Sequence, residues 1–81
     1  MNVQVRFFAG AKEIVGEEQV TVELQSRSTI GDLRAKLAEL HEELHPMASS
    51  LLFAIRTDYV TNSVVIEPDS EVVCFPPVSG G

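Results

Sequence analysis

Five consecutive residues in the middle of the chain, His41-Glu42-Glu43-Leu44-His45, match the HExxH pattern of zinc proteases. That chemistry needs both histidines on one helical face, a glutamate base, a third metal ligand and a cleft. His45 directly precedes Pro46, and the residue before a proline is pushed out of helical geometry. No later helix is predicted that could supply a third ligand. We therefore interpret the pair as a solvated helix end and predict no metal site.

The only cysteine, Cys74, would be a nucleophile or sulfur acceptor if its thiolate formed readily. All its neighbours between Val72 and Pro76 are apolar, so no charge nearby in the sequence lowers its pKa. We predict a cysteine that is packed in the core. A single cysteine also excludes an internal disulfide framework and fits a reducing compartment.

The third candidate is the end of the chain, Pro76-Pro77-Val78-Ser79-Gly80-Gly81. The two prolines favour a stiff, extended geometry that holds this tail away from the domain, and six extended residues reach about 20 Å. Because Gly80 and Gly81 lack side chains, we expect the terminus to enter a channel that is too narrow for any Cβ atom. The predicted working group is therefore the terminal carboxylate of Gly81.

Phe8 is a large aromatic residue on the otherwise polar face of the first predicted strand. It either fills a gap in the fold or marks an exposed patch for a partner. No cation follows Arg56, whereas four carboxylate side chains do. Together these features suggest an apolar patch with a negative rim.

Length and charge exclude several classes of function. With 81 residues the chain can form one modest core, which leaves little interior for a buried active site with several catalytic groups. Twelve carboxylates against six lysines and arginines give a net charge of -6, so we exclude nucleic acid as a partner and expect a basic protein surface. The start of the chain has no signal-peptide pattern, and no apolar run approaches membrane-spanning length. We expect a cytoplasmic protein with no membrane partner.

The elements that position these residues follow from apolar periodicity. Alternating apolar residues predict strands over residues 2–8 and 20–24, joined by one or two helical turns over residues 9–15 that end at Gly16. A buried strand is predicted over residues 51–55. Short strands follow at residues 59–60 and 64–66, and the last strand covers residues 72–75.

The clearest element is an amphipathic helix. Its apolar stripe repeats at steps of three and four residues, at Ile30, Leu33, Leu37, Leu40 and Leu44. We expect Thr29 to cap this helix together with Asp32, and Pro46 to end it. One helix packed on one face of a mixed sheet would bury these stripes, which is an α+β layout of the ubiquitin-like β-grasp type. The predicted domain covers residues 1–75, and residues 76–81 form an extended tail.

The chain resembles the MoaD-like small subunits of molybdopterin synthase, within the ubiquitin-like sulfur carriers. The resemblance runs over essentially the whole chain. It covers Phe7-Phe8-Ala9 with residues 13–16, the helix of residues 29–40, Leu51-Leu52, Glu71-Val72, and the ending Phe75-Pro76-Pro77-Val78-Ser79-Gly80-Gly81, which is its most specific part.

Two positions depart from the family pattern. Arg56 follows the predicted strand of residues 51–55, where the family often has asparagine. Asp69-Ser70 precede Glu71-Val72, where the family usually has Gly-Asp. Neither position touches the terminus, so both bear on the partner surface and on a turn.

The resemblance implies a sulfur carrier for molybdenum cofactor biosynthesis that binds no cofactor and is not catalytic alone. A ubiquitin-activating-like adenylyltransferase would use ATP to join the carboxylate of Gly81 to AMP, and a sulfur donor protein would displace AMP to leave a thiocarboxylate. In a heterotetrameric synthase, this sulfur would attack a cyclic pyranopterin monophosphate held by the large subunit. Gly80 would accompany Gly81 in the site. The partner-binding residues would be Phe8, Phe75, Pro76, Pro77, Val78 and Ser79.

Two alternatives remain open. A related carrier would deliver sulfur to thiazole or to tRNA, or would be conjugated to protein lysines. A plain binding module would carry an inert tail and would form no acyl-adenylate.

Overall fold

The computed structural model of the protein describes residues 1–77. The alternating residues at the start form β1 (Asn2–Phe7), in which Val3, Val5 and Phe7 are fully buried. A short helix, α1 (Ala9–Val15), links it to β2 (Gln19–Glu23), and the two strands pair antiparallel. Gly16 ends α1 with a φ of 81°, a left-handed conformation that glycine adopts without steric cost.

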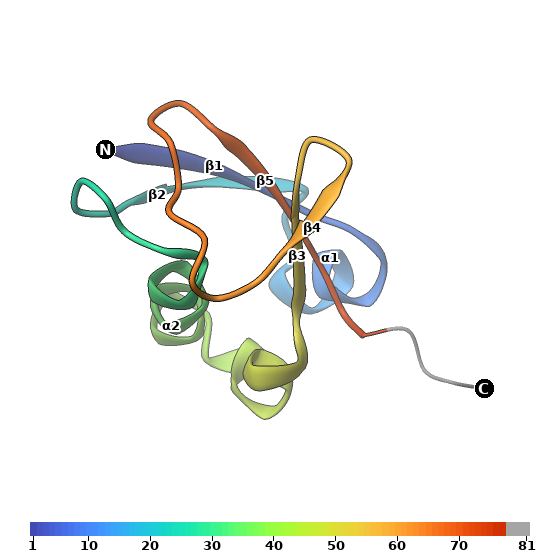
Figure 1. Cartoon of the computed structure of the whole chain (residues 1–81). Helices are drawn as coiled ribbons and strands as arrows, with labels where there is room; N and C mark the ends of the chain where they lie inside the picture. Colours follow the sequence, from blue (N-terminus) through green and yellow to red (C-terminus); the bar gives the residue numbers. More distant parts are fainter. Residues whose placement is uncertain (78–81) are drawn as a thin grey trace.

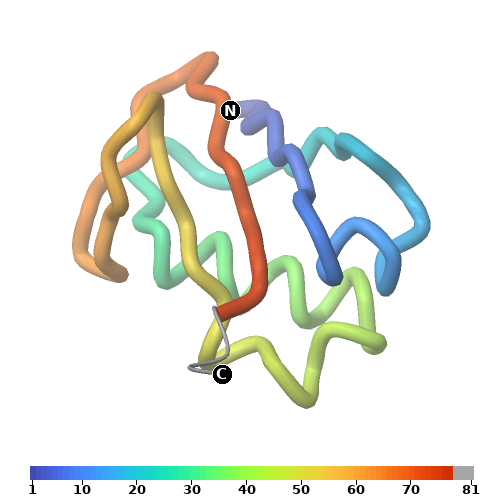
Figure 2. The backbone as a smooth tube through the Cα atoms, turned by 90° about the vertical axis from the view of Figure 1, so that its right-hand side faces the viewer, coloured from blue at the N-terminus to red at the C-terminus, as the bar shows by residue number. Residues whose placement is uncertain are grey.

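The five strands form one mixed sheet in the order β2-β1-β5-β3-β4. The last strand, β5 (Glu71–Phe75), runs between β1 and β3 (Figure 2). It is parallel to β1 and antiparallel to β3 (Leu52–Ile55), so both of its edges are hydrogen-bonded. The short β4 (Asp58–Val60) forms one edge of the sheet. The strand that leads to the tail is therefore held at the centre of the sheet.

The helix α2 (Ile30–Leu40) packs on one face of this sheet (Figure 1). Its predicted capping box is present, because Thr29 Oγ1 accepts from the Asp32 amide at 3.2 Å and the Asp32 carboxylate accepts from the Thr29 amide at 2.9 Å. Ile30, Leu33 and Leu37 are fully buried, as the stripe predicts. The mixed sheet with one main helix on one face confirms the predicted α+β layout.

The end of the helix differs from the prediction. It ends at Leu40, which is 52% exposed, and a 3-10 segment, η1 (Glu42–Ser50), follows. The buried Leu44 belongs to this 3-10 segment and not to the α-helix. Pro46 also lies inside the 3-10 segment. A 3-10 helix has a tighter turn than an α-helix, and its φ range accommodates proline. Apolar spacing alone did not distinguish the two helix types here.

Residues 64–66 do not form the predicted strand. They make a single bridge between Val65 and Thr29, and the rest of this stretch is a loop that crosses the start of α2. Backbone amides of Ile30 and Ile66 donate to carbonyls of Val64 and Ser28 at 2.9 and 2.8 Å. These bonds satisfy the backbone without a second strand, so the buried Ile66 reflects core packing rather than sheet pairing.

The side chain of Arg34 links the surrounding segments by hydrogen bonds. This role was not predicted from the sequence. Its guanidinium donates to the carbonyls of Ala48 and Leu51 at 2.8 and 2.7 Å and to Asn62 Oδ1 at 3.0 Å. It also lies 4.9 Å from the ring centroid of Phe53. One side chain of α2 therefore holds the end of η1, the entry to β3 and the loop after β4. Within the described part of the chain, no helix has the length and apolarity that a membrane span requires.

Candidate functional site

An apolar patch covers the open face of the sheet next to the exit of β5, and consists of Phe8, Ala54, Tyr59, Val73 and Phe75. These residues, with neighbours in the turns, line a shallow hollow of about 450 Å³. Alternation along β5 buries Val72 and Cys74 against the helix and turns Val73 and Phe75 to the open face. The patch therefore lies on the face that α2 does not cover.

Strand register brings the members of the patch together. Ala54 of β3 pairs with Val73 on one side and with Tyr59 on the other. The rings of Tyr59 and Phe75 meet edge to face, with centroids 5.5 Å apart. The Phe8 amide donates to the Cys74 carbonyl at 3.0 Å, which holds Phe8 beside β5. Four segments of the chain thus build one surface.

Exposure decides between the two roles considered for Phe8. Its side chain is 47% exposed and Tyr59 is 69% exposed, so neither fills a gap in the fold. Two exposed aromatic side chains on one surface are typical of a protein interface. Partner binding by Phe8 and Phe75 stays a prediction. Tyr59 and Val73 were not among the predicted site residues, because only the register shows that they join this surface.

The tail begins beside this patch. Pro76 is half-buried, and a Cβ atom built on Gly10 would lie 3.6 Å from its Cγ, so the proline ring lies against the first turn of α1. Pro77 is exposed. The other predicted site residues, Val78, Ser79, Gly80 and Gly81, lie outside the described residues. The boundary between a domain of residues 1–75 and a tail of residues 76–81 stays a prediction.

The carboxylates of the last third lie on one side of the patch. Arg56 lines the hollow, and its backbone has a φ of 61°. The carboxylates line a neighbouring groove, which shares Arg56 and Val73 with this hollow. Asp69 also has a left-handed φ, of 64°. At both departures from the family pattern, the backbone therefore has a positive φ, which asparagine or glycine adopts at a lower energetic cost.

Cys74 is fully buried, which confirms the predicted packed cysteine. Burial raises the pKa of its thiol from 9.0 to about 12, and the nearby positive charge of Arg34 offsets only part of that rise. The thiolate is therefore absent at neutral pH. An inert thiol fits a structural role.

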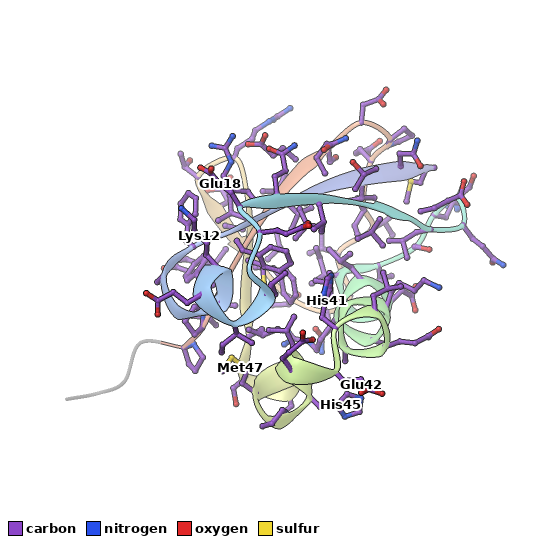
Figure 3. The ribbon with its side chains drawn as sticks, turned by 180° about the vertical axis from the view of Figure 1, so that it is seen from behind. Lys12, Glu18, His41, Glu42, His45 and Met47 are labelled. Carbon is purple, nitrogen blue, oxygen red and sulfur yellow. The ribbon has the colours of Figure 1, made fainter. Side chains whose placement is uncertain are left out.

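The HExxH residues do not share a helical face. His41 ends α2 with φ and ψ of -129° and 89°, and its ring meets Phe7 edge to face at 6.1 Å. His45 belongs to η1 and lies at the outer surface, so the two rings point apart (Figure 3). Among residues 1–77, no three His, Cys, Asp or Glu side chains are grouped so that they could hold a metal ion.

Comparison with known proteins places the chain among sulfur carriers. A family model described as the ThiS family matches residues 5–81. The chain belongs to the ThiS family. The molybdopterin synthase sulfur carrier subunit of Chlamydomonas reinhardtii is 30% identical over 83 residues, which span all of both chains. The resemblance to MoaD-like carriers is confirmed.

Solved structures confirm the ubiquitin-like β-grasp fold. SAMP1 from Haloferax volcanii superposes with a TM-score of 0.85 at 22% identity, and both chains are covered completely. The complex of subunits 1 and 2 of the molybdopterin-converting factor from Helicobacter pylori contains a chain that is 26% identical. It superposes with a TM-score of 0.71 and complete coverage of both chains.

Proposed function

We propose that this ThiS-family chain is the sulfur carrier subunit of a molybdopterin synthase. The observation that carries the proposal is the full-length match to relatives with that name, which includes the glycine pair at residues 80–81. The proposed reacting group is the carboxylate of Gly81. The described residues have a different task, which is to present this group to a partner.

The fold supports that task through the position of β5. This strand is hydrogen-bonded on both edges and ends at Phe75, inside the apolar patch. A partner that covers the patch would therefore hold the base of the tail in a fixed place. Fixed placement matters because a reacting group that is misplaced by about 1 Å can lose on the order of 100-fold in rate.

We propose the large subunit of the synthase as this partner. In Helicobacter pylori the similar chain is seen in a complex with subunit 2 of its converting factor. Exposed aromatic side chains at the patch supply the apolar area that such an interface buries. The pterin pocket and its acid-base groups would belong to the large subunit.

Activation must come first, because an ionised carboxylate is a poor electrophile. A carboxylate oxygen of Gly81 attacks the α-phosphorus of ATP within an adenylyltransferase, and pyrophosphate leaves. The terminal sulfur of a persulfide on a donor protein then attacks the acyl carbon, and AMP leaves as its bond to that carbon breaks. A thiol reductant next cleaves the S–S bond of the resulting acyl disulfide, which frees the donor protein as a mixed disulfide with the reductant. The product is a C-terminal thiocarboxylate, whose sulfur is transferred to the cyclic pyranopterin monophosphate. Since these steps consume ATP, we propose the cytoplasm as their compartment.

Mass spectrometry of the intact chain tests the proposal. After incubation with an adenylyltransferase, ATP and sulfide, we expect oxygen to be replaced by sulfur at the C-terminus. The thiocarboxylate form, mixed with the large subunit and cyclic pyranopterin monophosphate, should yield molybdopterin and the free carboxylate. A chain that forms thiocarboxylate but delivers its sulfur only to thiazole or tRNA would support a related carrier instead. A chain that forms no acyl-adenylate would be a plain binding module.

A further inference from the structure

A second hollow, which we call the acidic groove, lies between the β3–β4 hairpin and the loop that returns to β5. Its volume is about 600 Å³. The segments that enclose it are the hairpin, coloured yellow, and the orange loop in Figure 1. It borders the apolar patch, because Arg56 and Val73 line both hollows.

The floor of the acidic groove is apolar. Ile55, Val60 and Val64 line it, and each is only partly buried although it packs on the core. Val65 adds a side chain that is 48% exposed. This surface can bury apolar side chains of a ligand, which provides affinity that charge alone does not give.

The rim of the groove is negative. Asp58, Glu67, Asp69 and Glu71 line it, against the single guanidinium of Arg56. Glu71 also lies 4.0 Å from Arg6, so its charge is partly balanced. In the described part of the chain, no basic side chain lies within salt-bridge distance of the other three carboxylates. They are therefore available to a cationic ligand.

The backbone of the rim carries a cost. Asp69 has a φ of 64°, a region that glycine occupies without strain and that side chains with a Cβ atom occupy rarely. Asp69 lines the groove from this conformation, which costs some stability relative to glycine.

We propose that the acidic groove binds an extended, basic segment of a partner protein, in which lysine or arginine alternates with apolar side chains. The alternation matches an apolar floor below a carboxylate rim, since neighbouring side chains of an extended segment point to opposite sides. A purely polar cation would leave the floor uncovered, and an anionic segment would be repelled by the rim.

The groove reaches β5 from its beginning, whereas the tail follows its last residue. Groove residues precede the strand and extend to Val73, two residues before Phe75. Two residues of a strand span roughly 7 Å. A basic segment in the groove would therefore leave the tail free to react. This site is independent of the chemistry proposed for Gly81.

Amide chemical shifts can test the groove directly. The probe is the acetylated, amidated peptide Val-Lys-Val-Arg-Val, titrated into the isotope-labelled protein. We expect shift changes that are confined to residues 55–60, 64–71 and 73, which include all residues that line the groove. Neutralising three rim carboxylates with Asp58→Asn, Glu67→Gln and Asp69→Asn should weaken binding about tenfold, and raising the salt from about 20 mM to about 0.5 M should weaken it as well.

Another acidic cluster provides a matched control. Glu39→Gln, Glu42→Gln and Glu43→Gln remove the same number of negative charges, three, from a different site around the exposed Leu40 at the end of α2. This control should bind the peptide like the wild type, whereas Val65→Ser should weaken binding with the rim intact. Asp69→Gly should raise the melting temperature while it lowers affinity, because it removes both the strain and the charge.

Several results would overturn the proposal. They are absence of binding, an equal loss in the control, shifts that centre on the apolar patch, and identical shifts with spermidine. The last result would mean that the surface recognises charge alone. The peptide Val-Glu-Val-Glu-Val should produce no shifts, and binding of that peptide would also contradict the proposal.

Discussion

At the scale of single residues, the proposed function predicts that the terminal glycine pair is required for sulfur transfer but not for stability. Deleting Gly81, or adding one residue after it, should abolish sulfur transfer because the reacting carbon must sit at a fixed distance from the domain. The melting temperature should stay nearly unchanged, since a glycine tail contributes little apolar burial. Gly80→Ala adds one methyl group and should reduce transfer while the carboxylate stays in place.

Intact-mass spectrometry and a molybdopterin assay measure these outcomes. Gain of sulfur only by the full-length chain would agree with the proposal. Equal molybdopterin formation by the chain that lacks Gly81 would remove the terminus from the mechanism.

The raised pKa of the Cys74 thiol predicts that the stability of the fold depends on pH. Because burial raises the pKa of its thiol from 9.0 to about 12, the unfolded chain loses this proton first as the pH rises. The free energy of unfolding should therefore fall between these two pH values, by about 1.4 kcal/mol per pH unit from this group. Below pH 9 this loss is absent.

Chemical denaturation of wild type and Cys74→Ser across this pH range isolates the contribution of the thiol. The variant should lose about 1 kcal/mol at neutral pH, keep sulfur transfer and lack this part of the pH slope. Parallel pH profiles would show that the thiol is not held protonated by the fold. Loss of thiocarboxylate formation in the folded variant would instead indicate a persulfide relay through Cys74.

At the scale of secondary-structure elements, the contact between Gly10 of α1 and Pro76 predicts a constraint on the direction of the residues that follow. A methyl group at Gly10 would lie at an ordinary contact distance of 3.6 Å from Pro76, but a larger side chain would displace the ring. We expect Gly10→Ala to transfer sulfur normally. Gly10→Leu should slow transfer several-fold and shift the amide signals of Phe75 and Cys74 while the domain stays folded. Normal transfer by Gly10→Leu would show that this contact does not direct the tail.

The junction between α2 and η1 explains why the HExxH pattern has no catalytic geometry. The helix ends at Leu40, so the two histidines are not one helical turn apart. We expect His41→Ala with His45→Ala to retain sulfur transfer, and the purified wild type to contain no stoichiometric zinc by elemental analysis. Bound zinc that disappears in the double variant would contradict this interpretation. Loss of the contact between His41 and Phe7 should cost only about 1 kcal/mol of stability.

At the scale of the whole molecule, the apolar patch predicts how the carrier assembles. Phe8→Asp should weaken binding to the large subunit by about tenfold to 100-fold, because burial of a phenylalanine side chain contributes about 1.5–3 kcal/mol. The domain should remain folded, since this side chain is 47% exposed. Calorimetry with the purified large subunit measures the change in affinity.

Leu40→Asp is the matched control for this experiment. It also replaces an exposed apolar side chain with a carboxylate, at a residue that is 52% exposed on the opposite side of the sheet. Unchanged affinity for Leu40→Asp and reduced affinity for Phe8→Asp would locate the interface on the patch. Unchanged assembly in both variants would exclude Phe8 from the interface.

The sequence by itself determined the local elements of this protein. Alternation in β1, β2 and β5 and the three- and four-residue steps of α2 are short-range patterns that follow from side-chain geometry. The capping box is equally local, because Thr29 and Asp32 are three residues apart. The acidic charge and the glycine ending also needed no structure.

Tertiary structure alone decided where these elements meet. The patch depends on the register that sets Ala54 between Val73 and Tyr59, and register arises from long-range packing rather than from any local pattern. The same holds for the acidic groove, whose rim comes from two turns that the sequence separates by about ten residues. It also holds for η1, where Leu44 keeps its place in the core although the chain has left the α-helix. The spacing of apolar residues indicates which residues are buried, but the tertiary fold decides whether an α-helix, a 3-10 helix or a strand carries them.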